Sequence, residues 1–420
     1  MNNIKSTKIW NNSGMAIKIS SFTGLRPIKK LAHSIVSSSF DNLSVKEIKK
    51  ASKNINWNFL NILSPETFFP SHSKKQLTNY VRGYLKSMVD NQILFKDDEP
   101  NFYIYKLSKN SKVQFGVIAS IEINKKSQKN ILPHEKTFTS KENSILRNIE
   151  STKTQVGPVY LTYKNKNNLK LLFKKYSNTK PEYFFTSAGG TKHSLWVTKN
   201  FKDRNYISSQ LSKIETLYIA DGHHRFAAIS KLFKKTSQKN NKIKSVPLLA
   251  ALFDQSSVKI LSYNRLIKLK KTNPKEILDL IKKSFIDVKL CKFKKPNTKG
   301  DVMLFICNKW FSFNLLNINS KKVFSHETDI DLINLLIVDK ICRIKKNEYK
   351  NYLNYLPGKF GYKELEKKVR KNEADMAFFV CPMTMHEIMS ISNRKATVPQ
   401  KSTFFDPKLI DGLVNLQMKL

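Results

Sequence analysis

The segment from Glu215 to Phe233 constrains the fold of this chain more than any other, because it places a strand, a tight turn and a helix in direct succession. Leu217 to Ala220 is a short apolar run rich in strand-forming residues, and from Phe226 onward the apolar residues recur at helical spacing. Asp221-Gly222 is therefore predicted to be the turn between them. A strand that leads directly into a helix is typical of proteins that combine a sheet with helices, so we expect an α/β fold of the α+β type.

The predicted turn carries the residue types that a phosphate site needs. Asp221 is a good N-cap residue, and Gly222 allows a tight backbone. The first amide groups of a helix lack partners within the helix and attract anions. His223, His224 and Arg225 follow at once, and a guanidinium can hold a phosphate with two hydrogen bonds. We predict that residues 222–225 bind phosphate and that Asp221 holds a metal ion or orients a hydroxyl. A capped turn with incidental histidines is the alternative, although only 8 of 420 residues are His.

A second candidate site lies at His134-Glu135, between an extended segment and a helix predicted over residues 140–150. A carboxylate beside a bound hydroxyl can accept its proton, which makes Glu135 a candidate general base and His134 a candidate substrate contact. An exposed glutamate after a proline is also common in ordinary loops.

Three further places carry candidate binding residues, each with a simpler alternative. Lys401, Ser402 and Thr403 stand in a short loop bounded by prolines and are predicted phosphate contacts, although lysine is abundant throughout this chain. His193 and Trp196 follow the hairpin turn at Gly189-Gly190 and either line a substrate pocket or belong to the hairpin core. Arg265 ends a predicted strand and either faces a ligand or caps that strand.

The strong positive charge does not by itself indicate a nucleic-acid-binding protein. The chain has 75 Lys and Arg against 32 Asp and Glu, a net charge of +43. Such a balance usually suggests a nucleic acid or an anionic membrane as partner. Here lysine is spread along nearly every segment together with asparagine and isoleucine, which indicates a bias in composition. We expect only nonspecific, salt-sensitive attraction to polyanions.

Cysteine usage and hydropathy favour a cytoplasmic protein. The four cysteines are far apart and form no C-x-x-C pair, so neither a zinc site nor a disulfide framework is indicated. Residues 1–18 are basic and polar and are expected to form a loose extension and not a signal peptide. No run of about 18 apolar residues is present, so no membrane span is expected.

Three structural parts are expected after this extension, because 420 residues usually form two or three domains. We predict an N-terminal α/β domain over residues 19–120 and a central phosphate-binding domain of mixed sheet and helices over 121–268. A C-terminal α/β domain over 269–420 is expected to close the cleft.

Six colinear motifs identify the chain, from about residue 19 to 413, as a member of the domain-of-unknown-function family numbered 1015. The motifs are Phe22 with Leu25-Arg26-Pro27, Pro133-His134-Glu135, Gly157-Pro158-Val159, His193-Ser194-Leu195-Trp196, Tyr218 to Arg225, and Lys401-Ser402-Thr403 with Asp406-Pro407-Lys408. Where the family usually has Pro-Tyr-Asp, this chain has Ser39-Phe40-Asp41, so only Asp41 is retained as a candidate.

The middle of the chain, Pro133 to Arg225, is similar to the ParB and sulfiredoxin superfamily. Within it the chain resembles free serine kinases at two points, a Pro-His-Glu that carries a glutamate base and an Asp-Gly-His-x-Arg turn that binds the phosphoryl donor. The resemblance implies an enzyme that forms O-phosphoserine from free L-serine, with ATP, ADP or pyrophosphate as donor. It implies catalytic roles for Glu135, Asp221 and His223, with Mg²⁺ at Asp221.

Three alternatives remain open beside the kinase. A phosphoserine phosphatase would use the same residues with water as acceptor. A ParB-like, nucleotide-responsive DNA-binding protein would need a helix-turn-helix after the phosphate turn, whereas residues 246–265 are predicted to form strands. A noncatalytic anion-binding protein would not require both Glu135 and Asp221. The sequence predicts neither the oligomeric state nor the donor.

Overall fold

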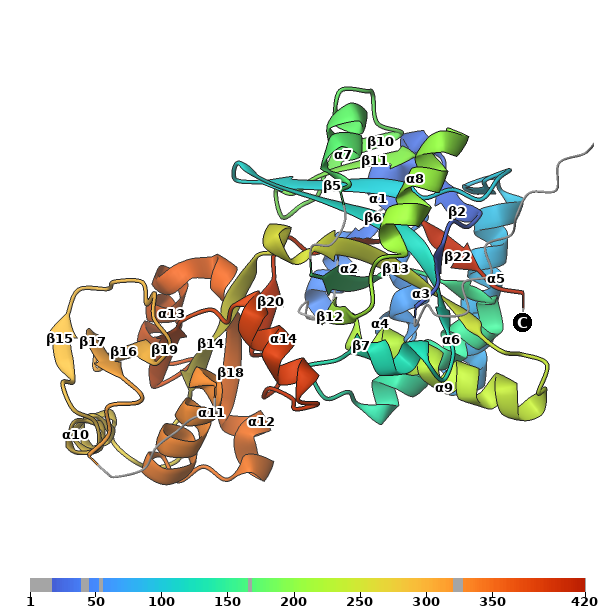
Figure 1. Ribbon diagram of the computed structural model, residues 1–420. Coiled ribbons are helices and arrows are strands. Elements are labelled where there is room, and N and C mark those ends of the chain that lie inside the picture. The colour runs from blue at the N-terminus through green and yellow to red at the C-terminus, as the bar shows by residue number, and fades with distance from the viewer. Residues whose placement is uncertain (1–16, 39–44, 53–55, 165–167, 320–327, 420) are drawn as a thin grey trace, which may run out of the picture. The chain divides into compact units, whose positions relative to one another are not determined.

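The computed structural model describes residues 17–38, 45–52, 56–164, 168–319 and 328–419 (Figure 1). The candidate Asp41 lies outside these residues. The chain forms two compact units, each built from segments that are distant in sequence. The first unit comprises Met1–Pro133, Thr137–Ser257 and Pro407–Leu420, and the second comprises His134–Lys136 and Val258–Asp406.

A nine-stranded mixed sheet forms the centre of the first unit, in the order β10-β11-β5-β6-β13-β9-β12-β7, with β1 paired to β6. The strands are β1 Ile19–Ser20, β5 Tyr103–Lys109, β6 Lys112–Ile123, β7 Ile131–Leu132, β9 Val159–Tyr163, β10 Tyr183–Thr186, β11 Lys192–Val197, β12 Leu217–Asp221 and β13 Val246–Asp254. β13 pairs with β9, and β12 with β7, in parallel, and the other neighbours are antiparallel. Nearly every residue of β13 is buried, as its continuous apolar run predicts.

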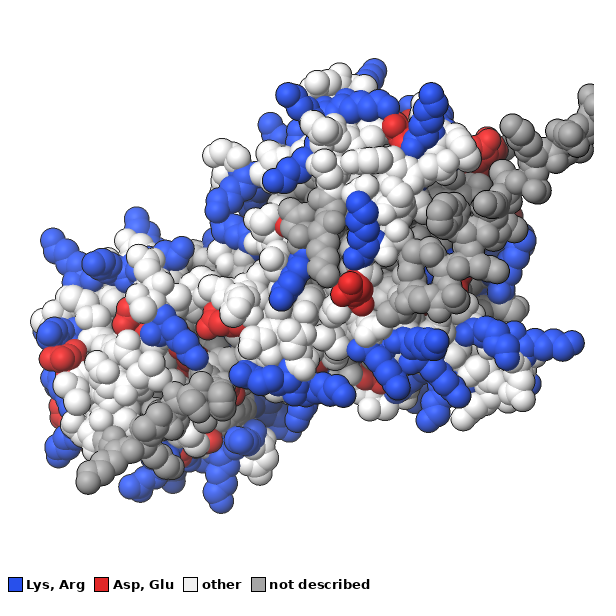
Figure 2. Space-filling view, in the orientation of Figure 1, with Lys and Arg blue, Asp and Glu red and all other residues white. Residues whose placement is uncertain are grey.

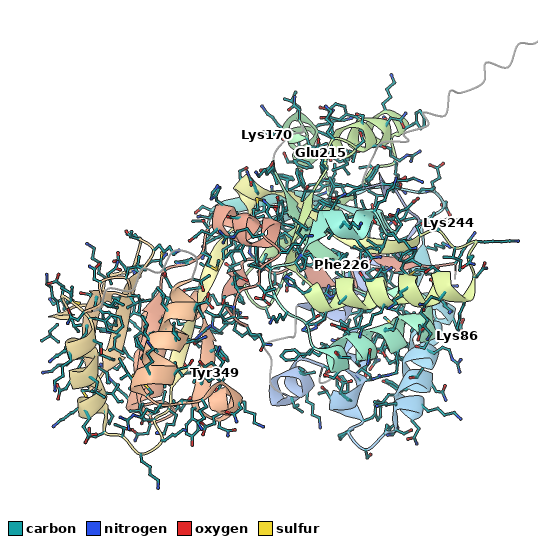
Figure 3. The ribbon with its side chains drawn as sticks, turned by 60° about the horizontal axis from the view of Figure 1, so that its bottom comes forward. Lys86, Lys170, Glu215, Phe226, Lys244 and Tyr349 are labelled. Carbon is teal, nitrogen blue, oxygen red and sulfur yellow. The ribbon has the colours of Figure 1, made fainter. Side chains whose placement is uncertain are left out.

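Helices and two short sheets complete the first unit. The helices are α1 Ala32–Ile35, α2 Val45–Ser52, α3 Leu60–Leu63, α4 Pro65–Phe68, α5 Lys74–Asp90, α6 Thr139–Thr152, α7 Lys170–Ser177, α8 Phe201–Leu211 and α9 His223–Lys239. α6 and α9 lie side by side and are joined by the ion pairs Lys231–Glu142 and Lys235–Glu150 (Figure 3). The short sheets have the orders β4-β2-β22-β8 and β21-β3. Their strands are β2 Gly24–Pro27, β3 Ser37–Ser38, β4 Leu94–Lys96, β8 Thr154–Gln155, β21 Ile410–Asp411 and β22 Asn415–Gln417. α9 packs on β6, β9 and β13, whereas α3 and α5 form a core with the short strands β2 and β4.

The second unit contains a seven-stranded sheet in the order β15-β17-β16-β19-β14-β18, with β20 paired to β14. Its strands are β14 Ile260–Ile267, β15 Lys289–Cys291, β16 Asp301–Ile306, β17 Lys309–Asn314, β18 Leu353–Pro357, β19 Met376–Val380 and β20 Thr403–Phe405. Its helices are α10 Pro274–Ser284, α11 Asp329–Leu332, a π-helix over Ile333–Ile341, α12 Tyr349–Tyr352, α13 Gly361–Arg370 and α14 Met385–Asn393. Aliphatic and aromatic side chains form a core on each face of this sheet.

The α/β fold class is confirmed, but the division of the chain differs from the three predicted parts. The predicted boundary at residue 120 lies inside β6, and strands from both sides of it form one sheet. Residues 246–265 contain β13 and β14, so the described residues directly after α9 form no helix-turn-helix. Among the described helices, none combines the length and the apolar character that crossing a membrane requires.

Candidate functional site

The predicted strand, turn and helix around Asp221 are confirmed, with one correction to the cap. β12 ends at Asp221, α9 begins at His223, and the N-cap residue is Gly222, not Asp221. Gly222 has a φ of 91°, in the left-handed region that favours glycine. The turn consists of this one residue. The Asp221 carboxylate accepts a hydrogen bond of 3.0 Å from the Gly222 amide, which stabilises the turn.

The second oxygen of the Asp221 carboxylate accepts a hydrogen bond from Lys408 Nζ at 2.7 Å. Burial by itself would raise the pKa of Asp221, but the charges of Lys408 and Arg225 and the hydrogen bond from Lys408 outweigh burial and lower that pKa to about 2. Asp221 is therefore an anion at neutral pH. The lysine comes from the C-terminal segment of the first unit, nearly 190 residues further along the chain.

Arg225 is held in place by two oxygen atoms. Its Nη1 donates to the Pro158 carbonyl at 2.7 Å and to Asp411 Oδ1 at 3.0 Å. The side chain of Asp411 is only 2% exposed, so this ion pair is largely shielded from water. Gly157, before the proline, has a φ of 83°, and a Cβ at this position would overlap Asp411 Oδ1. The Gly157-Pro158 motif and the Asp221 turn are thus parts of one packed arrangement.

The two histidines begin α9. His223 is buried, and its charge contributes to lowering the pKa of Asp221. His224 Nδ1 accepts a hydrogen bond of 3.3 Å from the Phe138 amide, and the two rings stack with centroids 5.9 Å apart. This contact orients the His224 imidazole at the N-terminus of the helix. Together the turn presents cationic side chains and helix amides beside one ionised carboxylate, an arrangement suited to an anion.

Glu135 and His134 belong to the second unit, where a threonine hydroxyl joins them. Thr403 Oγ1 donates to Glu135 Oε1 at 3.3 Å and lies 3.1 Å from His134 Nε2. His134 is fully buried, and its carbonyl accepts a hydrogen bond from the Val398 amide at 2.8 Å. Because a hydroxyl can donate to a carboxylate and accept from an imidazole at once, Thr403 orients both side chains.

Arg265 and Ser402, which are also predicted to bind substrate or phosphate, have partners within the loop 399–403. Ser402 Oγ donates to the Pro399 carbonyl at 2.6 Å. Arg265 Nη1 donates to the Lys401 carbonyl at 2.7 Å, and burial lowers the pKa of Arg265 to about 10. Lys401 has a φ of 57°, and its ammonium lies 5.3 Å from the centroid of the Tyr263 ring. In the structure Arg265 and Ser402 hold this loop, and their predicted ligand contacts stay predictions.

His193 and Trp196 lie on opposite faces of β11. His193 is buried, with Nδ1 2.7 Å from the Tyr105 hydroxyl and Nε2 3.2 Å from Ser187 Oγ. Burial lowers the pKa of His193 to about 3, so the ring is neutral at pH 7. Trp196 lines a cavity on the other face. The two residues therefore do not share one pocket.

The turn offers a magnesium ion one carboxylate, that of Asp221. Among the residues that the structure describes, no cluster of three or more His, Cys, Asp or Glu side chains could hold a metal ion. Mg²⁺ is commonly bound by one or two carboxylates together with phosphate oxygens and water. Asp221 therefore fits an ion that arrives with a phosphate donor better than one held by the protein alone.

Sequence reasoning missed Lys408 and Asp411 as partners of the turn. Lys408 belongs to one of the family motifs, but one lysine carries little information among 75 basic residues. Asp411 had a usable signal, because acidic residues are scarce in this chain and each of them can pair with a specific cation.

Comparison with known proteins identifies a family but no curated relative. The family described as "Protein of unknown function (DUF1015)" matches residues 19–335. No curated protein matches the chain.

Three solved structures with a similar fold illustrate the structural comparison. A free serine kinase in complex with AMP is 14% identical, with a TM-score of 0.38, and the match covers 72% of this chain and 92% of that one. SbnI with a C-terminal truncation, from Staphylococcus aureus, is 10% identical, with a TM-score of 0.37 and coverages of 69% and 85%. A conserved hypothetical protein from Pyrococcus furiosus is 16% identical, with a TM-score of 0.34 and coverages of 72% and 97%. Likenesses of this degree do not establish a shared activity.

Proposed function

Because the chain belongs to the family described as "Protein of unknown function (DUF1015)", whose description names no activity, we propose a function from its own site. The protein transfers a phosphoryl group from a nucleotide or pyrophosphate donor to the hydroxyl of free L-serine. The observation that carries this proposal is the turn at Asp221, where an ionised carboxylate, the N-terminus of α9 and cationic side chains meet. The choice of serine rests on the two motifs that resemble those of free serine kinases, Pro133 to Glu135 and Asp221 to Arg225.

The donor phosphates are assigned to the start of α9. The helix amides, the Arg225 guanidinium and hydrogen bonds donated by the imidazoles of His223 and His224 stabilise phosphate charge, which is the main contribution a protein makes to phosphoryl transfer. Asp411 and the Pro158 carbonyl hold Arg225 in one orientation. Lys408 keeps Asp221 ionised. When Mg²⁺ is bound with the donor, it supplies further charge neutralisation, and Asp221 is the residue that would hold it.

The base is assigned to Glu135. Its carboxylate accepts the proton of the serine hydroxyl while the serine oxygen bonds to phosphorus. The bond between that phosphorus and the bridging oxygen of the donor breaks, and the electron pair leaves with ADP, AMP or phosphate according to the donor. Thr403, through its hydrogen bond to Glu135, acts as a positioning residue.

Phosphorus NMR of the full chain with Mg²⁺ and L-serine tests this proposal, with ATP, ADP or pyrophosphate supplied in parallel. We expect a phosphoserine signal with one of the donors and its loss in Glu135→Gln, because the amide cannot accept the proton. Formation of phosphoserine at an unchanged rate in Glu135→Gln would contradict the assigned base. The absence of phosphoserine with every donor would overturn the kinase function, and release of phosphate from added phosphoserine would then establish the phosphatase alternative.

Thr403 provides a matched pair of variants. We expect Thr403→Val to lower kcat about tenfold with little change in the KM for serine, because the carboxylate loses a hydrogen bond that orients it. Thr403→Ser keeps the hydroxyl and should retain most of the activity. Equal losses in both variants would indicate that packing, and not the hydroxyl, explains the effect.

A further inference from the structure

A cavity of about 600 Å³ lies in the first unit, on the sheet face opposite to His193. It is lined by the residues around β10, β11 and β5 and by the start of α1. Its charged and hydroxyl-bearing lining includes Lys29, His33, Lys106, Lys180, Glu182 and Ser194. Its volume falls within the range of about 300–1,000 Å³ that is typical of small-molecule sites.

Three neighbouring strands present one row of side chains to this cavity. Phe184 of β10 pairs with Ser194 of β11, and Ser194 pairs with Lys106 of β5. Paired residues point to the same face, about 5 Å from one another, so an aromatic ring, a hydroxyl and an ammonium follow in order across the sheet. Trp196 lies two residues beyond Ser194 on the same face and is buried beneath the cavity.

The cavity and the Asp221 turn occupy different places in the sheet. Between β11, which lines the cavity, and β12, which ends at the turn, stand β5, β6, β13 and β9. Tyr105 alternates with Lys106 on β5, so its side chain points away from the cavity, and it is hydrogen bonded to the backbone of Ile410. The segment that carries Lys408 therefore packs on the Tyr105 face.

The cavity has an excess of cationic groups. Lys29 pairs with Glu182 at 3.2 Å, which neutralises the one acidic residue of the lining. Within the described residues, neither Lys106, Lys180 nor His33 forms an ion pair. Lys106 lies over the Phe115 ring, 5.5 Å from its centroid, which restricts the position of the ammonium. Lys106 and Lys180 can therefore contact an anionic group of a ligand, and no carboxylate of the lining competes for them.

Phe184 supplies the second recognition element. Its side chain is 63% exposed although it stands in a strand, and it borders the cavity directly beside Ser194. An exposed ring in this position offers a stacking surface for a planar group. Trp196 offers no donor, because its indole N–H already donates to the Thr179 carbonyl at 3.1 Å.

We propose that this cavity is a second ligand site that binds a mononucleotide, independently of the phosphoryl-transfer site. The base stacks on Phe184, the phosphate contacts Lys106 and Lys180, and Ser194 lies between them, within reach of the sugar. The row of ring, hydroxyl and ammonium matches the order of base, sugar and phosphate.

Calorimetric titration of the full chain with AMP, adenosine and inorganic phosphate tests the second site. We expect AMP to bind and both Phe184→Ala and Lys106→Gln to weaken this binding about tenfold, because each removes one recognition element. Two matched controls should stay within about twofold of the unmodified chain. Phe201→Ala removes an equally exposed phenylalanine, at 67%, from α8, and Lys112→Gln removes an exposed lysine from β6 outside the lining.

The other outcomes overturn the proposal. If AMP does not bind, or binds unchanged in Phe184→Ala, the cavity is not a nucleotide site. If inorganic phosphate binds as tightly as AMP, the Phe184 ring contributes nothing to binding. If adenosine binds as tightly as AMP, the lysines contribute nothing. A single-stranded oligonucleotide that binds far more tightly than AMP would point to a polynucleotide instead.

The same titration separates this site from the turn. AMP binding at the cavity should persist in His224→Ala, because His224 belongs to the turn. Phosphoserine formation should persist in Phe184→Ala. Failure of the proposed kinase would leave the AMP result unaffected, so the two proposals fail separately.

Discussion

At the scale of single residues, the ion pair with Lys408 stabilises the ionised form of the Asp221 carboxylate. Both side chains are mostly buried, at 24% and 20% exposed, so water screens their attraction only partly. A buried carboxylate without this lysine would be costly to keep charged. The pair therefore stabilises the first unit and fixes the orientation of the Asp221 carboxylate.

The variant Lys408→Met should lower the free energy of unfolding by about 2 kcal/mol at pH 7, between the values typical of exposed and of fully buried ion pairs, because Lys408 and Arg225 are the main charges that lower the pKa of Asp221 from 3.8 to about 2. Because the folded-state pKa is the lower one, this stabilisation is present above about pH 4 and is lost as the pH falls towards 2. Urea unfolding at pH 7 measures the difference, and carbon NMR of Asp221 measures its pKa, which should rise in the variant.

Lys86→Met is the control for Lys408→Met, because Lys86 pairs with Asp90 on the exposed surface of α5. Exposed pairs of this spacing contribute at most about 0.5 kcal/mol. Equal losses in the two variants would show that the Asp221 pair has no special role. An unchanged pKa of Asp221 in Lys408→Met would show that Lys408 does not control its ionisation.

At the scale of elements, two glycine turns bring the site residues of the first unit together. Gly222 lets β12 enter α9 through a single residue, and Gly157 lets the chain pass beside Asp411 before β9. Both have positive φ angles, 91° and 83°. The local geometry of these turns determines where Asp221 and Arg225 point.

Gly157→Ala should destabilise the first unit by about 3 kcal/mol or more, because the new Cβ overlaps Asp411 Oδ1 in addition to the cost of a positive φ. Gly190→Ala is the matched control. Gly190 also has a positive φ, 74°, but a Cβ there meets no atom within 4 Å, so a loss of about 1 kcal/mol is expected. Urea unfolding compares the two, and similar losses would show that the contact with Asp411 is easily relieved.

Elements with a strong local pattern are predictable from this sequence, and weak ones are not. In α5, six apolar residues repeat at helical spacing, and this pattern alone predicts a helix. α8 has no such pattern, because its buried apolar side chains are only Ile207 and Leu211, while Phe201 is exposed. The Pro357-Gly358 dipeptide is typical of a turn, yet Leu356 and Pro357 end β18, which pairs with β14, a strand nearly 90 residues earlier in the chain.

At the scale of the whole molecule, the features that the sequence does not predict are contacts between segments that are distant along the chain. The turn at Asp221 is predictable because its strand and helix are local, whereas Lys408 reaches it from a segment that returns to the first unit after the second unit is complete. Likewise, Thr403 meets Glu135 across 268 residues. No periodicity or spacing indicates such pairings, so the sequence predicts the strand, turn and helix but not the distant side chains that contact them.

The net charge of +43 is a property of the whole molecule, and its distribution bears on the DNA-binding alternative. Lys and Arg side chains are spread over elements of both units on the face shown in Figure 2, with no single basic stripe. We therefore expect binding to duplex DNA that is independent of sequence, unaffected by nucleotides, and weaker by about a thousandfold or more between 50 and 200 mM salt, because phosphate contacts release counterions. Fluorescence anisotropy with two unrelated duplexes measures this dependence. The opposite result would be a preference for one duplex at 150 mM salt that added nucleotide alters. Such a preference requires a defined DNA-binding surface and would favour the DNA-binding alternative.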